Sequence, residues 1–183
     1  MVLLDLIRQR RSIRKYIDKA VEKEKLLTCL EAARLAPSAC NSQPWKFIVV
    51  DDKDLKDELC NTAFKGLYKI SAFAKTAPVI IAIVSEKSKV LARVGGKIRN
   101  IGYYLIDIGI AGEHFILQAQ ELGLGTCWIG WFDERAVKKV LKVPRGKKVD
   151  VLISLGYPEK KTLPTARKRE PIEDISSYNS YIS

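Results

Sequence analysis

NIGYYLIDIGIAGEHFILQAQEL, residues 100–122, is the longest stretch with a helical pattern in this 183-residue chain. The stretch is apolar nearly all round, and a helix without a polar face is buried. It is also rich in small residues, which let another element approach closely: Gly102, Gly109, Ala111, Gly112 and Ala119. One chain of this length has little else with which to surround such a helix. We therefore expect a second copy of the chain to pack against it.

Shorter patterns on both sides of this helix predict the remaining elements. Helical spacing of apolar residues occurs at 2–9, 22–35, 51–63 and 133–141. Strand patterns occur at 45–50, 79–84 and 148–155, and the second is so continuously apolar that we expect burial on both faces. Long, uneven segments separate the strands, among them a polar connection at 85–98. This order favours an α+β fold, in which helices flank a mixed, mainly antiparallel sheet.

The length predicts a single domain over residues 1–183, of which 157–183 form a C-terminal arm. The arm has several prolines and few core residues, so alone it could not offset the entropy lost on ordering. It is therefore either disordered or laid across a partner subunit. Its apolar side chains favour the partner, because burial there would stabilise them: Ile172, Ile175, Tyr178 and Tyr181.

The composition is that of a soluble globular protein, with 47% hydrophobic and 29% charged residues. No apolar run reaches the roughly 18 residues that a membrane span needs. The first apolar run contains Asp5 and Arg8, which a signal peptide would not have there. We therefore expect a cytoplasmic protein with no membrane partner.

The four cysteines, at positions 29, 40, 60 and 127, do not form a CxxC pair, and His114 is the single histidine. A zinc site needs a tighter cluster of such ligands, so we expect scattered reduced cysteines and no metal. His114 lies inside the long apolar helix. Because buried polar groups are normally satisfied, we expect a hydrogen-bonded histidine in the core or at a dimer contact.

The net charge of +11 indicates an anionic partner, either nucleic acid or a small molecule that carries phosphate. The alternative is that lysine and arginine simply coat helix surfaces. Two segments are dense in positive charge, at 8–15 and 167–169. The sequence has no Walker A pattern, no GxGxxG after a strand and no GxSxG. With no obvious nucleophile or base, an enzyme of this sequence would take its reactivity from a cofactor.

Four motifs, in order, resemble those of the FMN-dependent nitroreductase family. They are Arg10-Arg11-Ser12-Ile13-Arg14, the stretch PSACNSQPW at 37–45, the stretch LGLGTCWIG at 122–130, and Leu155-Gly156-Tyr157-Pro158 followed by Arg167-x-Arg169-x-Pro171-Ile172-Glu173. Each motif alone is weak, but together they extend over nearly the whole chain, from about residue 5 to 178.

The resemblance implies residues for the phosphate and ribityl chain of FMN. Arg10, Ser12 and Arg14 would hold them, with Arg11 nearby. Arg167 and Arg169 would return from the arm to the same phosphate. Arginine suits this role because its forked guanidinium makes charge-assisted hydrogen bonds to phosphate oxygens. Alone, each cluster would be read as a solvated helix end or a charged tail.

The resemblance also implies which segments lie at the flavin ring. The loop with Pro37, Ser38, Ala39 and Asn41 would reach across a homodimer to the flavin of the other subunit. The segment Trp128-Ile129-Gly130 would pass the face and edge of the isoalloxazine, with the backbone N–H of Gly130 near N5. Since a backbone donor does not titrate, no catalytic side chain is required.

The resemblance implies an FMN oxidoreductase that works by a ping-pong mechanism. NADH or NADPH would deliver a hydride to N5, and a nitroaromatic or quinone would then take it. Within the family, the alternatives are a protein electron donor, dehalogenation, or chemistry on the flavin itself. Outside it, the chain would be a flavin sensor or a basic nucleic-acid-binding module. We expect no nucleic acid, because Trp45, Trp128 and Trp131 lie in apolar company rather than on a basic face.

Overall fold

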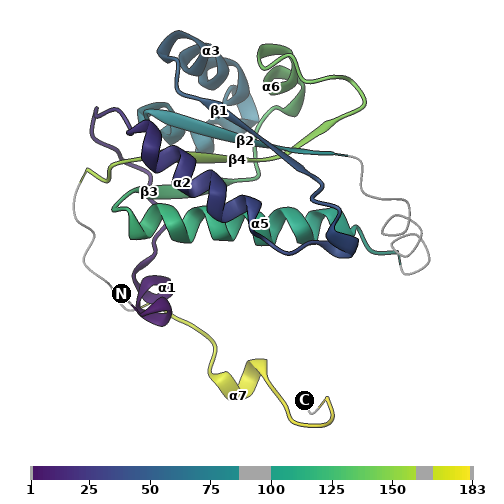
Figure 1. Ribbon diagram of the computed structural model, residues 1–183. Coiled ribbons are helices and arrows are strands. Elements are labelled where there is room, and N and C mark those ends of the chain that lie inside the picture. The colour runs from purple at the N-terminus through teal and green to yellow at the C-terminus, as the bar shows by residue number, and fades with distance from the viewer. Residues whose placement is uncertain (1, 87–99, 160–166, 182–183) are drawn as a thin grey trace.

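The computed structural model describes residues 2–86, 100–159 and 167–181. Within these ranges, four strands form one sheet in the order β1-β2-β4-β3, and every neighbouring pair is antiparallel (Figure 1). The strands are β1 (Trp45–Val50), β2 (Val79–Ser85), β3 (Gly125–Ile129) and β4 (Lys148–Gly156). A parallel element is present only as a bridge between Ser12 and Thr126 in the described part. The predicted α+β fold with a mainly antiparallel sheet is confirmed.

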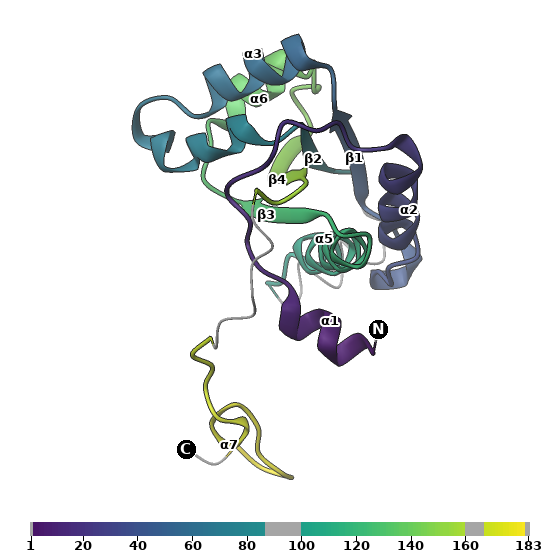
Figure 2. The ribbon, with the colours of Figure 1, turned by 90° about the vertical axis from the view of Figure 1, so that its left-hand side faces the viewer.

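Helices cover both faces of this sheet, as Figures 1 and 2 show. One face carries α3 (Lys53–Ala63), α6 (Glu134–Val140) and the 3₁₀ segment η2 (Gly66–Thr76). The other face carries α2 (Lys23–Arg34) and α5 (Tyr103–Glu121). The central strand β2 lies between both layers, and its residues from Val79 to Val84 are at most 2% exposed. The predicted burial of this strand on both faces is confirmed.

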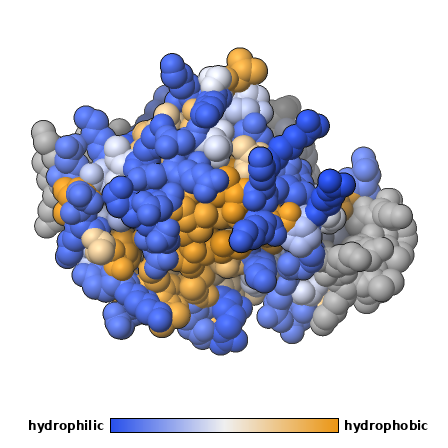
Figure 3. Space-filling view, turned by 90° about the horizontal axis from the view of Figure 1, so that it is seen from above, coloured by the Kyte–Doolittle hydropathy of each residue, from blue (hydrophilic) through white to orange (hydrophobic). Residues whose placement is uncertain are grey.

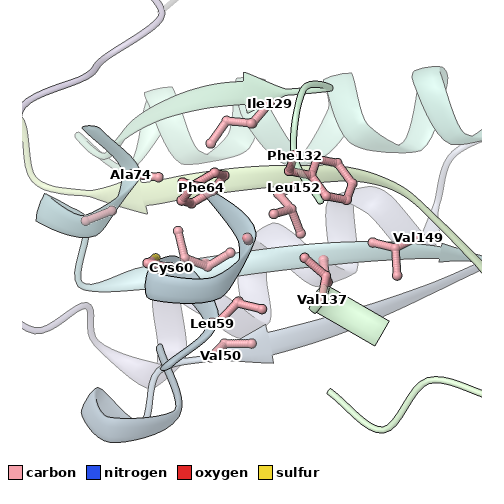
Figure 4. Packing of buried hydrophobic residues seen from close by; sticks show 14 of the residues in the cluster. Val50, Leu59, Cys60, Phe64, Ala74, Ile129, Phe132, Val137, Val149 and Leu152 are labelled. Carbon is pink, nitrogen blue, oxygen red and sulfur yellow. The ribbon is translucent and has the colours of Figure 1, made fainter. Parts of the chain in front are cut away.

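The core on the α3–α6 side is built from large apolar side chains: Leu59 and Phe64 face the sheet, and Leu152 on β4 faces them (Figure 4). Both helices on this side begin at an aspartate that accepts a backbone N–H of its own first turn. Asp52 accepts from Leu55 at 2.8 Å, and Asp133 accepts from Ala136 at 3.0 Å. These caps satisfy amide groups that have no partner within the helix, and they therefore fix the residue at which each helix begins.

The cluster on this side is not completely closed. Ile48, Leu55 and Val140 pack against it and remain partly exposed. Figure 3, which looks down on this layer, shows an apolar area rimmed by hydrophilic side chains. On the opposite side of the sheet, Phe47 and Phe115 stack with ring centroids 6.0 Å apart, which joins α5 to the edge strand β1.

Helix α5 is buried on one side only within a single chain. Ile108, Ala111 and Phe115 face the sheet and α2, whereas Leu105 and Ile106 are 48% and 51% exposed. The expected burial all round is thus not met inside one chain, although α1 (Leu3–Gln9) and η1 (Ala39–Asn41) also contact α5.

The C-terminal arm projects away from the body of the molecule and carries the short helix α7 (Ile172–Ile175) (Figures 1 and 2). Its four apolar side chains are all 70% or more exposed: Ile172, Ile175, Tyr178 and Tyr181. The described arm therefore has no core of its own, as the sequence predicted.

Four elements were missed by the sequence patterns, among them the short helical segments η1 (Ala39–Asn41) and α7 (Ile172–Ile175). The segment 125–129 is the edge strand β3, and the segment 66–76 is the 3₁₀ segment η2. The predicted polar connection at 85–98 lies largely outside the described residues. None of the helices that the structure describes is long and apolar enough to cross a bilayer.

Candidate functional site

The extended segment after α1 is held against the edge of β3. The backbone N–H of Ile13 donates to the carbonyl of Thr126 at 2.8 Å, next to the bridge between Ser12 and Thr126. Gly125 makes this close approach possible, because a Cβ there would lie 2.6 Å from Cγ1 of Ile13. The register of the segment is therefore set by backbone pairing, and the side chains on either side of Ile13 have defined positions.

A buried tyrosine fixes the end of the same segment. Tyr16 Oη donates to the carbonyl of Ile13 at 2.7 Å, and it shares a hydrogen bond of 2.8 Å with Oγ of Ser154 on β4. Burial, only partly opposed by the Ser154 hydroxyl, raises the pKa of Tyr16 above its usual value, so the phenol stays neutral.

Arginines from both ends of the chain meet beside this segment. Arg167 Nη2 donates to the backbone carbonyl of Arg10 at 2.7 Å. Arg11 Nη1 donates to the carbonyls of Arg8 and Arg10, at 2.7 Å and 3.0 Å. Partial burial, and then the charges of Arg11, Arg10 and Arg169, hold the pKa of the Arg167 guanidinium below its usual value. The fold thus gathers positive charge that an anion would relieve.

One carboxylate approaches this arginine cluster, which we define as Arg10, Arg11, Arg167 and Arg169. Glu113 Oε1 on α5 lies 3.9 Å from Nε of Arg10, at the limit of an ion pair. The donor set fits a phosphate group, because several guanidinium groups converge and one exposed carboxylate at this distance compensates little of their charge.

Ser12 and Arg14 lie near the buried thiol of Cys127, as Arg10 does. Burial raises the pKa of this thiol, whereas Arg14, a hydrogen bond with Ser12, and Arg10 act in the opposite direction. The guanidinium of Arg14 also lies 5.6 Å from the ring centroid of Phe73 on η2. The first predicted motif is therefore assembled as one surface, bounded by β3 and η2.

The three predicted residues at the end of β3 point in different directions. Ile129 is 3% exposed and belongs to the core on the α3–α6 side, whereas Trp128 lies on the opposite face and is 41% exposed. The Trp128 ring rests on α5 at Gly112, where a Cβ would lie 2.4 Å from Cζ3 of the indole. Gly130 is exposed, and a Cβ on it would meet nothing within 4 Å. Of this group, Ile129 is closed to a ligand, whereas Trp128 and the backbone of Gly130 are accessible.

Trp131 connects the end of β3 to η2, and the sequence patterns did not identify this role. Its indole N–H donates to the carbonyl of Leu67 at 2.9 Å, and Ser71 Oγ donates to the Trp131 carbonyl at 2.9 Å. The rings of Tyr68 and Trp131 are 5.2 Å apart. The aromatic pair Tyr68–Trp131 therefore holds η2 beside Gly130.

The loop at 37–43 folds onto itself and onto α5. Ser38 Oγ accepts the backbone N–H of Gln43 at 2.9 Å, and Gln43 Nε2 donates to Oδ1 of Asn41 at 3.0 Å. The backbone N–H of Ala39 donates to Oδ1 of Asp107 on α5 at 3.0 Å. Pro37 precedes these contacts and is exposed. The Ala39 amide is thus already engaged within its own chain.

The structure does not bring this loop to the arginine cluster of the same chain. Figures 1 and 2 place the loop beside the N-terminal end of α5, away from α1 and the segment that follows it. The predicted site residues therefore form two separate groups, one at 10–14 with 128–130 and 167–169, and one at 37–41.

The remaining candidate residues have structural roles. His114 Nδ1 lies 3.3 Å from the carbonyl of Ala32, so the expected hydrogen bond is confirmed, although the residue is partly exposed rather than in the core. None of the four cysteines forms a disulfide, and burial raises the pKa of the Cys60 thiol to about 11. Among the residues that the structure describes, no three His, Cys, Asp or Glu side chains are grouped so that they could hold a metal ion.

The chain belongs to the nitroreductase family, whose model matches residues 7–157. A relative described as an NADH dehydrogenase, from Thermus thermophilus, is 31% identical, and the match covers 91% of each chain. An iodotyrosine deiodinase from Thermotoga neapolitana is 27% identical over 86% of this chain and 89% of its own. A solved structure of an FMN-dependent nitroreductase from Clostridium difficile R20291 has a TM-score of 0.74 and 34% identity, over 97% of this chain and 99% of that one. Oxidoreductase chemistry is the functional class that follows.

Proposed function

We propose that this protein is a cytoplasmic, homodimeric FMN oxidoreductase that forms a single nitroreductase-like domain. The observation that carries the proposal is the arginine cluster, in which residues 157 positions apart in sequence meet and Arg167 has a lowered pKa. The similarity to an FMN-dependent nitroreductase supports the same cofactor. Bound FMN would supply hydride transfer, from NADH or NADPH and then, in a second half-reaction, to a nitroaromatic or quinone.

Each group of residues has a separate task in this proposal. The arginine cluster, with Ser12 and Arg14, would bind the phosphate and ribityl chain and so fix the position of the cofactor. The backbone N–H of Gly130 would donate to the ring near N5, and the open space there leaves room for a flat ligand. The aromatic pair Tyr68–Trp131 would hold η2 beside the ring. These residues bind and orient, and none of them has to exchange a proton.

A second subunit would complete the site. Because the loop at 37–43 lies away from the arginine cluster of its own chain, Pro37, Ser38, Ala39 and Asn41 would reach the cofactor of the partner. An apolar surface on α1, α5 and β3 is available for this contact: Leu3, Leu4, Ile7, Leu105, Ile106 and Trp128 are all at least 41% exposed. The arm, which has no core of its own, would lie across the partner.

Replacing Ile106 by aspartate should convert the dimer to a monomer, because a charge in the middle of a buried apolar contact loses its hydration without gaining a partner. We expect the mass measured by light scattering to fall by half and FMN to be lost with it. Leu67→Asp is the matched control, since Leu67 is 85% exposed and lies on η2. A dimeric Ile106→Asp variant would contradict the proposed interface.

The visible absorption spectrum of the purified protein tests the function directly. We expect a flavin band, either as purified or after addition of FMN, and its loss when NADH or NADPH is added without oxygen. A band that persists would favour the alternatives, in which a protein donates the electrons or the flavin acts as a sensor. Absence of flavin binding would overturn the proposal and would favour nucleic acid as the partner of the positively charged residues.

A further inference from the structure

The loop at 37–43 has a backbone conformation that needs support from outside the loop. Cys40, Asn41 and Gln43 have φ values of +52°, +49° and +46°. Residues with a Cβ rarely adopt this left-handed region, and they persist in it only where the surrounding structure determines their conformation. Hydrogen bonds inside the loop cannot fix its orientation relative to the rest of the protein, so an external contact is required.

Asp107 on α5 provides such a contact. The residue is 4% exposed, and its Oδ1 accepts the backbone N–H of Ala39 at 3.0 Å. Its second oxygen, Oδ2, is buried and has no hydrogen-bond partner among the residues described. A buried carboxylate is costly unless it is paired, so a fold that needed only packing here would be better served by an apolar side chain.

We propose that Asp107 is a positioning residue, which holds the 37–43 loop through the Ala39 amide in the conformation that presents the loop to the cofactor. The contact explains why Ala39 differs from its neighbours in the loop: its N–H points back into its own subunit. Pro37 and Asn41, which are exposed, are then left to face outward, whereas the Ser38 hydroxyl accepts the Gln43 N–H. This inference rests on the proposed function, in which the loop reaches the cofactor of the partner subunit.

Two variants separate the hydrogen bond from the volume of the side chain. Asp107→Leu keeps a similar shape but leaves the Ala39 amide without an acceptor, whereas Asp107→Asn keeps a side-chain oxygen. Asp150→Leu is a matched control, because Asp150 is a partly buried carboxylate on β4, outside the loop and its contacts.

The first readout is amide hydrogen–deuterium exchange of the 37–43 segment without FMN. We expect slow exchange at Ala39 in the wild type and in Asp107→Asn, and fast exchange in Asp107→Leu but not in Asp150→Leu. The second readout is the Kd for FMN, which should rise about tenfold or more in Asp107→Leu, as expected for loss of a hydrogen bond to a charged group. Asp107→Asn should remain within about threefold of the wild type, because the acceptor is restored.

Two results would overturn the inference. One is an Ala39 amide that exchanges in the wild type as fast as an unprotected loop amide, which needs no variant to be seen. The other is an Asp107→Leu variant that binds FMN as the wild type does. A wild type that binds no FMN would instead overturn the proposed function, while the exchange data would still show whether Asp107 holds the loop.

Discussion

Replacing Arg10 and Arg167 together by alanine should raise the Kd for FMN by at least about a hundredfold. Loss of each guanidinium would remove charge-assisted hydrogen bonds to the phosphate, worth about 1.5–3 kcal/mol per bond. A change of about 1.4 kcal/mol in binding free energy corresponds to a factor of ten in Kd. The Arg167→Ala change also removes the contact that holds the arm to the Arg10 carbonyl. Fluorescence titration of the apoprotein with FMN measures the effect, and riboflavin, which lacks the phosphate, should lose far less affinity.

Arg8→Ala is the matched control for this pair. Arg8 belongs to the same basic run, but its side chain is 69% exposed and lies 3.6 Å from Asp5. A surface ion pair of this kind contributes about 0–1 kcal/mol. We expect the Kd of the control to change by less than about threefold. A double variant that bound FMN as tightly as this control would show that the phosphate lies elsewhere.

Phe115→Ala should lower the free energy of unfolding by about 3–5 kcal/mol, the range for removing a buried aromatic side chain and leaving a cavity. Phe115 is 0% exposed, and its ring stacks on Phe47. Since folded domains are stable by only about 5–15 kcal/mol, the loss is a large part of the total. Urea unfolding followed by circular dichroism should show a lower midpoint with an unchanged m value.

The matched control for Phe115→Ala is Leu67→Ala, because Leu67 is apolar but 85% exposed. The backbone carbonyl of Leu67 accepts a hydrogen bond from the Trp131 indole N–H, and loss of the Leu67 side chain leaves this bond in place. We expect a change within about 0.5 kcal/mol. An equally small effect at Phe115 would mean that α5 is not packed on the sheet as the structure has it.

Much of the fold could be predicted because the apolar periods are long and uninterrupted. The run from Val79 to Val84 predicted the central strand, and the helical spacing at 51–63 and 133–141 predicted two helices. Strand β3 was missed because five residues, one of them glycine, are too few for a period, and the pairing with β4 that makes it a strand is not a local property.

The arginine cluster shows what local sequence patterns cannot supply. Positive charge at 8–15 and at 167–169 is visible in the sequence, but either segment alone reads as a solvated surface. Their meeting depends on the sheet that lies between them in the chain, and it was predicted only through the resemblance of four motifs. The role of Trp131 had no such signal in the sequence, because a tryptophan after a strand can equally pack in the core or connect the strand to another segment.

The hydrogen bond from Arg167 to Arg10 means that the proposed phosphate site takes its charge from two segments that lie 157 positions apart in the sequence. A chain that has lost its last segment to a protease would retain the whole sheet and both helical layers, yet only part of the charge that faces the phosphate. The fraction of protein that binds FMN would then indicate whether the chain had been cleaved, even where the sheet and helices were still folded. A yellow preparation would then be evidence that the segment with Arg167 is still attached to the chain.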